Sequence, residues 1–504
     1  MDRKKIPFEI LLMFSVFIIA ICGLVYELVA GALASYLLGD SVKQFSFIIG
    51  VYLFSMGVGS FLAKYIHKDL FDSFVDVEIL VGLIGGISSV VLFLVFNLTD
   101  HFQWILYLFV FLTGCLVGVE IPLLMNILKD KVVFKDLVSN VFAVDYIGAL
   151  IASILFPLVL IPQLGIIKTP LFFGLINVSV AIFLSFYFSK DLKRKRFSQF
   201  KGIFSFLVLL FLFIFSDKIL AYSEEKLYGE NVIYTHNSPY QRIALTRNDK
   251  EFRLYLNNNL QFSSLDEYRY HEALVHPAMS MAPNIKNVLV LGGGDGFAVR
   301  EVLKYKEVKD VVLVDLDGEM TDFFKRNETM VQLNQKSLSN PKVEIINQDA
   351  YMWIKNCKKK FDVIIVDFPD PSNYSLGKLY SLQFYQELKR VTRPETFISM
   401  QTTSPYFAPK SFWSIQKTVN QVFNNATAYH TYVPSFGEWG YCLVSDIPIN
   451  NKIYHRLNGL RYYDYNFNQL SYFSKDMKAD NVEINRLDNQ ILVRYFDEEW
   501  GKVQ

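Results

Sequence analysis

The sequence predicts a chain in two parts, an α-helical multi-pass membrane domain followed by an α/β domain with a doubly wound, mostly parallel sheet. The composition predicts the division, because residues 1–222 consist of long apolar runs whereas the remainder is mixed like a soluble protein. Short apolar runs that alternate with helical patterns from Val288 onward predict the α/β class. At 504 residues, the chain is long enough for more than one domain.

Six apolar stretches in the first part are long enough to cross a bilayer, for which about 18 apolar residues suffice. They span residues 10–38, 44–66, 77–96, 102–128, 138–162 and 168–188. A seventh stretch, 202–221, has a shorter uncharged core. The first stretch is too long, and is followed by too many others, to be a removable signal peptide. The lipid bilayer is therefore an expected partner, against the alternative of a very apolar soluble helical domain.

Basic residues gather on alternate loops between these stretches and predict a cytoplasmic amino terminus. They are Arg3, Lys4 and Lys5, then Lys64 and Lys68, then Lys129, Lys131 and Lys135, then the run 190–201. Two topologies remain open. If all seven stretches cross, the second part emerges on the outer face, and if 202–221 lies at the interface or re-enters, the second part stays inside.

The second part is expected to begin with a small antiparallel sheet. Residues 230–262 alternate apolar and polar side chains, and turn signals interrupt them at 237–239, 248–249 and 257–259. Residues 266–282 then have a helical pattern, with Asp266 near its start. We therefore predict a β-rich subdomain at 223–275 and a larger α/β domain at 276–504.

Five strands of the α/β domain are predicted by short runs rich in β-branched residues. They are VLVLG at 288–292, VVLVD at 311–315, VEIIN at 343–347, FDVIIVD at 361–367 and FISMQ at 397–401. Helices are expected between them at 297–306, from Glu319, from Tyr351 and near 383–393. Strands joined by such crossovers pair in parallel, so that their carboxyl ends meet at one edge of the sheet.

A glycine-rich turn after the first of these strands predicts a nucleotide-like ligand. The stretch Val288–Asp317 follows the pattern of strand, glycine-rich turn, helix and second strand ending in an acid. Asp295 stands among the glycines, where a loop that binds pyrophosphate gains nothing from a carboxylate. A carboxylate there suits a cationic group, which predicts a positively charged nucleoside such as a sulfonium nucleoside.

Several motifs in the second part together carry a family resemblance. Residues 230–446 contain SPYQRIAL, YHE, GGGDG, VDLD, QDAYMW and VIIVDFPDP in that order. This part resembles spermidine synthase and related polyamine aminopropyltransferases, and the whole chain is similar to the bacterial membrane-bound, multi-pass branch of that family. The resemblance implies a Rossmann-like, methyltransferase-type fold. It also implies transfer of the aminopropyl group of decarboxylated S-adenosylmethionine to putrescine or a related amine, with spermidine and methylthioadenosine as products.

The expected donor site lies in the glycine-rich turn and at the strand ends. Asp295 is expected to pair with the ammonium of the decarboxylated donor and to repel the carboxylate of ordinary S-adenosylmethionine. Asp315 is expected to accept hydrogen bonds from the ribose hydroxyls. The resemblance adds five further residues to the donor site, namely Gln241, Gly292, Gly294, Asp349 and Ala350. The alternative for the strand-end acids is that they only cap helices.

The expected acceptor site follows the fourth predicted strand. Asp367 is the candidate that takes a proton from the attacking amine, which Tyr270 orients. No covalent intermediate, metal or further cofactor is expected, because the sulfonium is already a good leaving group. Other residues expected to bind the amine are His271, Asp295, Asp370 and, by resemblance, Glu438. The alternative for DFPDP is a plain turn, and departures from the family pattern at 368–369 and 373–378 leave the acceptor's identity open.

Acidic residues inside the apolar stretches raise a second class of function. Glu27, Glu120 and Asp145 lie within apolar runs, where ionisable residues are functional hypotheses by default. If they face one cavity, they bind a polycation and make the chain a polyamine transporter or sensor with a ligand-binding synthase-like domain. The alternative is that each lies near an interface or bonds between helices.

Other classes of function are disfavoured. A methyltransferase that uses S-adenosylmethionine is disfavoured because Asp295 opposes the donor's carboxylate. The four cysteines form no CxxC motif, so neither a disulfide framework nor a zinc site is indicated. No nucleic-acid partner is expected, and the family resemblance implies a homodimer. The catalytic domain is placed in the cytoplasm because its donor is a cytosolic metabolite.

Overall fold

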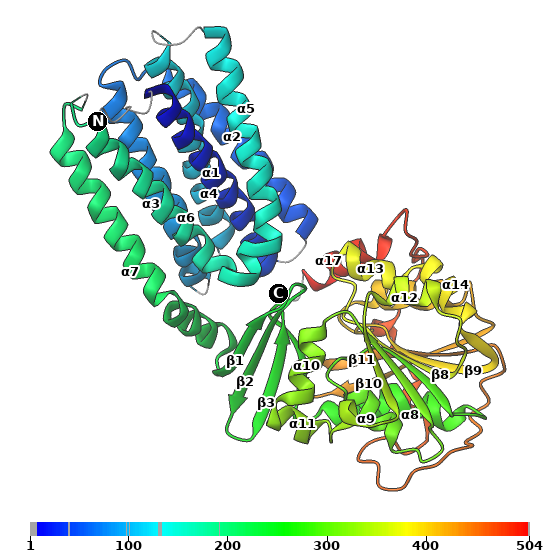
Figure 1. Cartoon of the computed structure of the whole chain (residues 1–504). Coiled ribbons are helices and arrows are strands. Elements are labelled where there is room, and N and C mark those ends of the chain that lie inside the picture. The colour runs from blue at the N-terminus through cyan, green and yellow to red at the C-terminus, as the bar shows by residue number, and fades with distance from the viewer. Residues whose placement is uncertain are drawn as a thin grey trace. The chain divides into compact units, whose positions relative to one another are not determined.

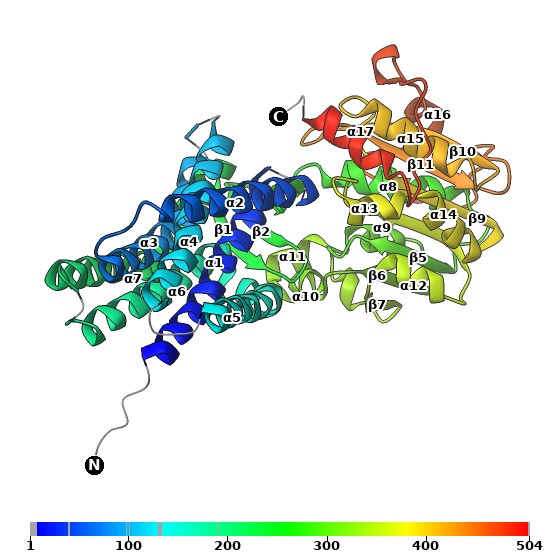
Figure 2. The same cartoon turned by 90° about the horizontal axis from the view of Figure 1, so that it is seen from above.

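The computed structural model describes residues 8–38, 41–96, 98–99, 101–129, 134–190 and 192–501. Within these ranges the chain divides into two compact units, Met1–Val232 and Ile233–Gln504. The first unit is helical and the second combines strands and helices (Figures 1 and 2). The basic residues at positions 3–5 and 131, which contribute to the predicted topology, lie outside the described residues.

The helical unit, as far as it is described, is a bundle of seven long helices (Figure 1). They are α1 (Phe8–Leu38), α2 (Ser41–Ala63), α3 (Leu70–Phe96), α4 (Phe102–Leu128), α5 (Phe134–Leu155), α6 (Ile161–Tyr187) and α7 (Lys195–Tyr228). A π-helical turn, Phe156–Leu160, precedes α6, and Gly165 bends the start of α6 with a φ of 73°. The predicted seventh apolar stretch lies within α7.

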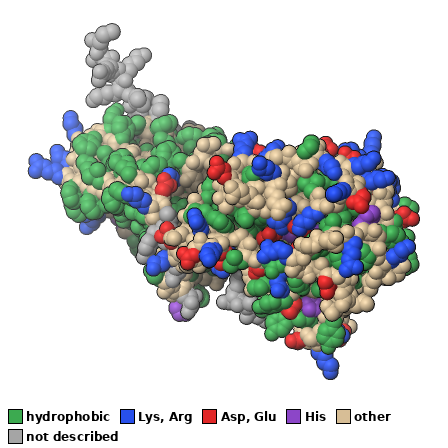
Figure 3. All heavy atoms as spheres, turned by 90° about the horizontal axis from the view of Figure 1, so that it is seen from below, with side chains coloured by type: hydrophobic (Ala, Val, Ile, Leu, Met, Phe, Trp, Pro, Cys, Tyr) green, Lys and Arg blue, Asp and Glu red, His purple; other side chains and the backbone are tan. Residues whose placement is uncertain are grey.

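Six stretches of this unit are long and apolar enough to cross a membrane, with α5 and α6 counted as one. Large apolar side chains are exposed along these helices, as with Phe54 at 67%, Trp104 at 74% and Leu158 at 70%. Apolar side chains cover the helical unit in the face seen in Figure 3, whereas charged groups are scattered over the α/β unit. Both observations suit a lipid-facing surface.

Glycines allow helix backbones of this unit to approach closely. A Cβ on Gly174 of α6 would lie 2.6 Å from the carbonyl oxygen of Gly82 on α3. A Cβ on Gly118 of α4 would lie 2.1 Å from the carbonyl oxygen of Met56 on α2. Such small-residue contacts are a common means of packing helices in lipid.

The α/β unit contains two sheets, and the turns and crossovers of the chain determine the order of the strands in each. The small sheet joins β1 (Asn231–Asn237), β2 (Arg242–Asn248), β3 (Glu251–Leu256) and β4 (Asn259–Ser263) in sequence order. The large sheet has seven strands in the order β10-β11-β9-β8-β5-β6-β7. Its parallel strands are β5 (Asn287–Gly292), β6 (Asp310–Asp315), β7 (Val343–Asn347), β8 (Phe361–Asp367) and β9 (Thr392–Gln401). An antiparallel hairpin of β10 (Asn425–Val433) and β11 (Gly437–Ser445) extends the sheet beyond β9.

Helices cover both faces of the large sheet. They are α8 (Glu267–Met281), α9 (Phe297–Leu303), α10 (Gly318–Arg326), α11 (Glu328–Leu333), α12 (Ala350–Asn356), α13 (Tyr374–Gly377), α14 (Leu382–Arg390), α15 (Pro409–Val419), α16 (Phe467–Leu470) and α17 (Ile491–Trp500). Alternate residues of β5 serve two cores, since Val288 and Val290 pack with α8 and α9 whereas Leu289 and Leu291 pack with α12 and α14. The predicted fold class, a helical region followed by an α/β domain with a small antiparallel sheet, is confirmed.

The strand order places a topological switch point, where doubly wound sheets form their ligand-binding crevice, at the carboxyl ends of β5 and β8. The chain proceeds from β5 through β6 to β7 and then returns to the other side of β5 with β8. Ligands of doubly wound sheets bind at such a switch point. Gly292 and Asp367 are register partners there, so the glycine-rich turn and the acid that ends β8 lie side by side.

Candidate active site

A glycine-rich turn, Gly292–Gly296, connects β5 to α9 at this switch point. Gly292, Gly293 and Gly296 have φ values of 75°, 69° and 79°, in the left-handed region that favours glycine. A Cβ on Gly292 would lie 2.2 Å from the carbonyl oxygen of Asp367. The absence of side chains therefore lets the turn pass directly over the end of β8.

Asp315 ends β6 and holds the other side of this turn. Its Oδ2 accepts a hydrogen bond from the N–H of Gly294 at 3.0 Å, and its Oδ1 accepts one from the N–H of Asp317 at 2.9 Å. Burial raises the pKa of Asp315 to about 6, although both N–H groups favour the carboxylate. Capping of α10 is done by Asp317, which leaves Asp315 facing the turn.

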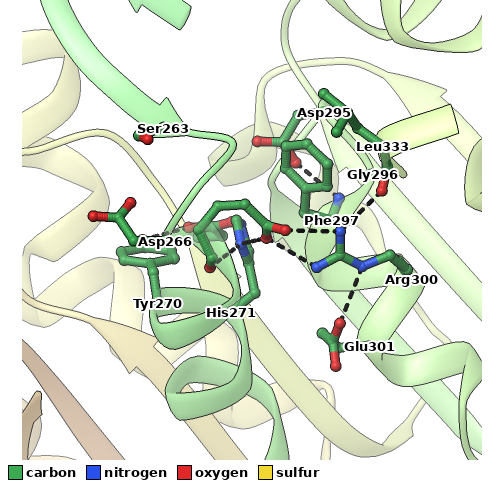
Figure 4. Close-up of polar contacts among 12 residues, drawn as sticks. Ser263, Asp266, Tyr270, His271, Asp295, Gly296, Phe297, Arg300, Glu301 and Leu333 are labelled. Atoms are coloured by element: carbon green, nitrogen blue, oxygen red, sulfur yellow. Dashed lines mark hydrogen bonds and ion pairs between the residues drawn. The ribbon is translucent and has the colours of Figure 1, made fainter. Parts of the chain in front are cut away.

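Asp295 lies within the turn. Its Oδ1 accepts a hydrogen bond from the N–H of Phe297 at 2.9 Å (Figure 4). Its carbonyl oxygen accepts one from Nδ2 of Asn334 at 3.0 Å. Burial raises the pKa of Asp295 to about 6; His271 acts in the opposite direction, and the negative charge of Asp367 adds to the rise. Two acids from neighbouring strand ends are thus electrostatically coupled in one crevice.

Asp367 is held by a tyrosine of α8. The hydroxyl of Tyr270 donates to Oδ1 of Asp367 at 2.6 Å. Burial raises the pKa of the Asp367 carboxyl, while His271 and the hydrogen bond from Tyr270 restrain that rise. A buried acid with a raised pKa is a better proton acceptor than an exposed carboxylate.

His271 forms part of a buried ion-pair network behind the acids (Figure 4). Its Nδ1 lies 2.8 Å from Oε2 of Glu267, and the side chain is 3% exposed. Arg300 donates to both oxygens of Glu267, at 3.0 and 2.9 Å. Burial acts to lower the pKa of His271, but pairing with Glu267 outweighs it and the pKa is raised. The positive imidazolium is thereby favoured next to Asp295 and Asp367.

Asp370 lies in the loop after β8 and is held from β9. Its carboxylate accepts hydrogen bonds from Oγ1 of Thr403 at 3.2 Å and from Nε2 of Gln401 at 3.5 Å. Gln401 also donates to the hydroxyl of Tyr380 at 2.8 Å. Burial raises the pKa of Asp370 to about 7. Neither Gln401 nor Tyr380 was singled out from the sequence.

The β10–β11 hairpin surrounds Tyr270 with aromatic rings. The ring centroids of Phe436, Trp439 and Tyr441 lie 6.2, 6.5 and 5.6 Å from that of Tyr270. Tyr441 also donates its hydroxyl to the carbonyl oxygen of Tyr270 at 3.3 Å. The sequence shows the alternation that places Trp439 and Tyr441 on one face, but it does not show which face meets the site.

The structure does not bring Glu438 together with these groups. Its Oε2 lies 2.8 Å from Nδ1 of His430, whose Nε2 lies 2.6 Å from the carbonyl oxygen of Tyr472. Alternate residues of a strand face opposite sides, so Glu438 points away from the face that carries Trp439 and Tyr441. Trp439, the next residue along β11, lies on the face that meets Tyr270, and the amine-binding role expected for Glu438 stays a prediction.

Asp349 and Ala350 lie at the start of α12. Asp349 caps that helix by accepting from the N–H of Met352 at 3.0 Å, as the alternative reading of the strand-end acids held. Its Oδ2 also lies 2.6 Å from Nζ of Lys378. Burial acts to raise the pKa of Asp349, but the ion pair with Lys378 lowers it. Ala350 is buried against the sheet.

Gln241 follows the turn after β1 and reaches the start of α10. Its Nε2 donates to Oδ2 of Asp317 at 2.8 Å. Next to this contact lies a pocket of about 360 Å³. Its lining residues are Pro239, Tyr240, Leu316, Asp317, Gly318, Glu319, Asp322 and Asn347. Gln241 therefore borders the residues that follow Asp315.

The fold and the site described above define an α/β domain with a Rossmann-like sheet, and comparisons with known proteins identify its class. Residues 267–452 match the family described as the spermine/spermidine synthase domain. The chain is 49% identical to polyamine aminopropyltransferase of Leptospira interrogans, over 97% of this chain and 98% of that protein. It is 48% identical to polyamine aminopropyltransferase 2 of Ralstonia nicotianae, over 98% of both chains. A crystal structure of spermidine synthase with the transition state analogue AdoDATO matches 48% of this chain and 84% of that chain, with 28% identity and a TM-score of 0.44.

These relatives extend over both units of the chain. The chain belongs to the polyamine aminopropyltransferase family, and it is an aminopropyltransferase.

Proposed function

We propose that the α/β unit transfers the aminopropyl group of decarboxylated S-adenosylmethionine to putrescine or a related diamine. The carrying observation is that Asp295 and Asp367 meet in one crevice from neighbouring strand ends, with His271 electrostatically coupled to both. Donor and acceptor are both cationic at neutral pH. A site with one buried acid for each of two cations suits this pair of substrates.

The donor is assigned to the glycine-rich turn. Asp295 pairs with the terminal ammonium of the donor arm and repels the carboxylate of ordinary S-adenosylmethionine. Asp315, held by the N–H of Gly294, accepts hydrogen bonds from the ribose hydroxyls. Asp349, Ala350 and Gln241 are assigned to the nucleoside by family resemblance.

Transfer needs one proton to leave the acceptor first. The acceptor ammonium, with a reference pKa of about 10.4, gives a proton to Asp367. The freed nitrogen lone pair attacks the methylene beside the sulfonium, so that a C–N bond forms and the C–S bond breaks. Sulfur keeps the bonding electron pair and leaves as neutral methylthioadenosine, while the product carries a secondary ammonium. Because a carboxylate is a weak base for this task, alignment of the two substrates supplies much of the rate, up to about 7–11 kcal/mol in well-oriented systems.

The acceptor is assigned to the space beside Tyr270. Asp370 carries a carboxylate there from the loop after β8, and the rings of Phe436, Trp439 and Tyr441 line the approach. Aromatic faces attract alkylammonium groups by cation–π interaction. Spermidine is the product if putrescine is the acceptor.

Mass spectrometry of reaction products tests this function. Purified full-length protein is given decarboxylated S-adenosylmethionine with a panel of diamines, and ordinary S-adenosylmethionine serves as the control donor. We expect spermidine and methylthioadenosine from putrescine, with turnover at least about 100-fold lower in the Asp367→Asn variant. Asp310→Asn is the matched control, because Asp310 is exposed at the opposite end of the parallel sheet. Absence of an aminopropylated product with every amine would refute the proposal.

We further propose that the helical unit anchors the enzyme in the cell membrane with the α/β unit in the cytoplasm. The six apolar stretches and their exposed side chains support the anchor, and the cytosolic origin of the donor supports the side. Fusions of alkaline phosphatase and of a fluorescent protein to the carboxyl terminus report the side. Fluorescence without phosphatase activity is expected, and the reverse result would place the α/β unit outside.

A homodimer is proposed from the family resemblance alone. Light scattering of the detergent-solubilised protein, corrected for bound detergent, measures the mass. Twice the chain mass is expected, and a single chain mass would reject the dimer.

A further inference from the structure

The helical unit contains a buried acidic pair that the proposed reaction does not use. Glu78 of α3 is 0% exposed and Glu120 of α4 is 6% exposed. Both lie within helices long and apolar enough to cross a membrane. An ionisable residue at such a position is costly, which makes it a functional hypothesis by default.

The polar atoms around this pair lack partners among the described residues. They comprise both carboxylate oxygens of Glu78, Oε1 of Glu120, the hydroxyl of Tyr26 and Oδ1 of Asn177. Tyr26 of α1 is 4% exposed and Asn177 of α6 is 0% exposed. A buried polar atom left without a partner costs about 1–3 kcal/mol. Oε1 of Glu120 and Oδ1 of Asn177, which can only accept when the Glu120 carboxyl is ionised, therefore lack donors among the described residues.

Four helices bring these groups to one place. Glu78 and Glu120 interact electrostatically with each other, and Tyr26 interacts with both. Nδ2 of Asn177 donates to the carbonyl oxygen of Glu78 at 3.0 Å. The ring of Tyr26 lies directly over Gly85 of α3, where a Cβ would come within 2.7 Å of Cδ2. Tyr26, Glu78, Glu120 and Asn177 are called the intramembrane cluster.

The sequence analysis identified part of this cluster. Glu120 belongs to it, whereas Glu27 and Asp145 are more exposed than either member of the acidic pair. The sequence analysis missed Glu78 because it lies near the start of an apolar run, and charged residues are common at the ends of such runs. Burial against α6, which the sequence does not show, makes it exceptional.

The chemistry of the cluster selects a cation that donates hydrogen bonds. Carboxylate and amide oxygens accept only, and two carboxylates bring negative charge. Among the described residues, no group of three or more His, Cys, Asp or Glu side chains could hold a metal ion. An alkylammonium has N–H donors and a positive charge, and the face of Tyr26 suits it as well.

We propose that the intramembrane cluster binds an ammonium group of an aliphatic polyamine. The choice of a polyamine over other ammonium compounds rests on the proposed function, whose acceptor and product are polyamines. The binding site itself rests on the helical unit alone.

Equilibrium dialysis of radiolabelled spermidine against full-length protein in nanodiscs tests this site. Wild type is compared with Glu78→Gln, Glu120→Gln and Tyr26→Phe. We expect each Glu variant to lose one bound equivalent, with at least tenfold weaker binding, and Tyr26→Phe to bind several-fold more weakly. Asp217→Asn is the matched control, because this exposed acid of α7 pairs only with Lys168 among the contacts described.

Measurements of turnover distinguish a failure of this binding-site proposal from a failure of the proposed enzymatic function. The cluster variants are expected to keep wild-type kcat, which shows that the α/β unit is intact, and to keep the wild-type thermal midpoint in nanodiscs, which shows that the helical unit is folded. Asp367→Asn is expected to lose turnover and keep the intramembrane equivalent. If sodium or potassium chloride, but not spermidine, fills the site, the cluster is an inorganic cation site and the proposal fails. Unchanged spermidine binding in both Glu variants would overturn it as well.

Discussion

At the scale of single residues, the acids of the crevice set the pH dependence of donor binding. Burial places the pKa of Asp295 at about 6, and only its ionised form attracts the donor ammonium. We expect kcat/KM for the donor to be constant above this pH and to fall about tenfold per pH unit below it. The measurement is kcat/KM between pH 4.5 and 8. Persistence of the same inflection in Asp295→Asn would assign the titration to another group.

A second residue-scale prediction concerns the contact between Gly294 and Asp315. A Cβ on Gly294 would lie 2.8 Å from the carboxylate carbon of Asp315, closer than real contacts allow. Gly294→Ala is therefore expected to displace Asp315 and raise the donor KM at least tenfold, with a smaller effect on the acceptor KM. Gly318→Ala is the control, because its Cβ would meet Asn347 at an ordinary 3.4 Å. Equal KM values in wild type and Gly294→Ala would contradict the role given to Asp315.

The candidate site was predictable where local patterns determine position. Asp295, Asp315 and Asp367 stand at strand ends or in the turn between strand and helix, and the parallel sheet brings such positions together. Where Glu438 lies could not be predicted in the same way, because the face that a strand residue occupies depends on register, which a one-residue shift inverts. The pairing of Glu267 with Arg300 was not predictable either, since nothing in local sequence links residues on two separate helices.

At the scale of elements, the Glu267–Arg300 pair joins α8 to α9 and positions His271. Removing Arg300 leaves the buried Glu267 with His271 as its remaining ionic partner, and loss of one partner of a buried pair costs about 3–5 kcal/mol. We expect Arg300→Leu to lower the thermal midpoint of the full-length protein in detergent markedly. The control is Arg326→Leu, whose exposed pair with Asp322 is worth about 0–1 kcal/mol. Similar midpoints for the two variants would show that the buried pair contributes little.

The periodicity of the sequence predicted where helices and strands lie along the chain, but it did not predict which side chains of different elements contact one another. Strands β5 to β9 and the helices between them lie where alternation and breakers predicted them. The segment 373–378, which departs from the family pattern, contains the short helix α13 and ends at Lys378, which reaches Asp349. Side-chain pairs of this kind depend on how loops pack, for which the chain carries no local signal.

At the scale of the whole molecule, the helical unit predicts how the protein partitions. If the six apolar stretches bury their surface in lipid, as proposed, they resist extraction by salt, because ions screen electrostatic contacts but do not weaken apolar burial. We expect the chain to remain in the membrane pellet after washes with 1 M salt (about 3 Å screening length) and with alkaline carbonate, and to dissolve in mild detergent. Release by salt alone would show that attachment is electrostatic.

Composition was enough to predict the two units, because lipid and water demand different side chains over long stretches. It did not reveal which acids of the helical unit meet. Glu78 and Glu120 lie on different helices, and their juxtaposition depends on helix rotation and on the glycine contacts between α3 and α6. Periodicity indicates an apolar helix but does not fix its rotation when nearly every face is apolar.

The close passage of Gly292 over the end of β8 limits how this enzyme can be redesigned. Because the turn proposed to receive the donor rests on the backbone of Asp367, the residue proposed to serve the acceptor, neither can be exchanged without the other. A protein engineer who wants a longer or bulkier amine should leave both untouched. The parts to vary are the β10–β11 hairpin and the segment 373–380. Their sequences can be randomised while the glycine-rich turn and Asp367 are kept.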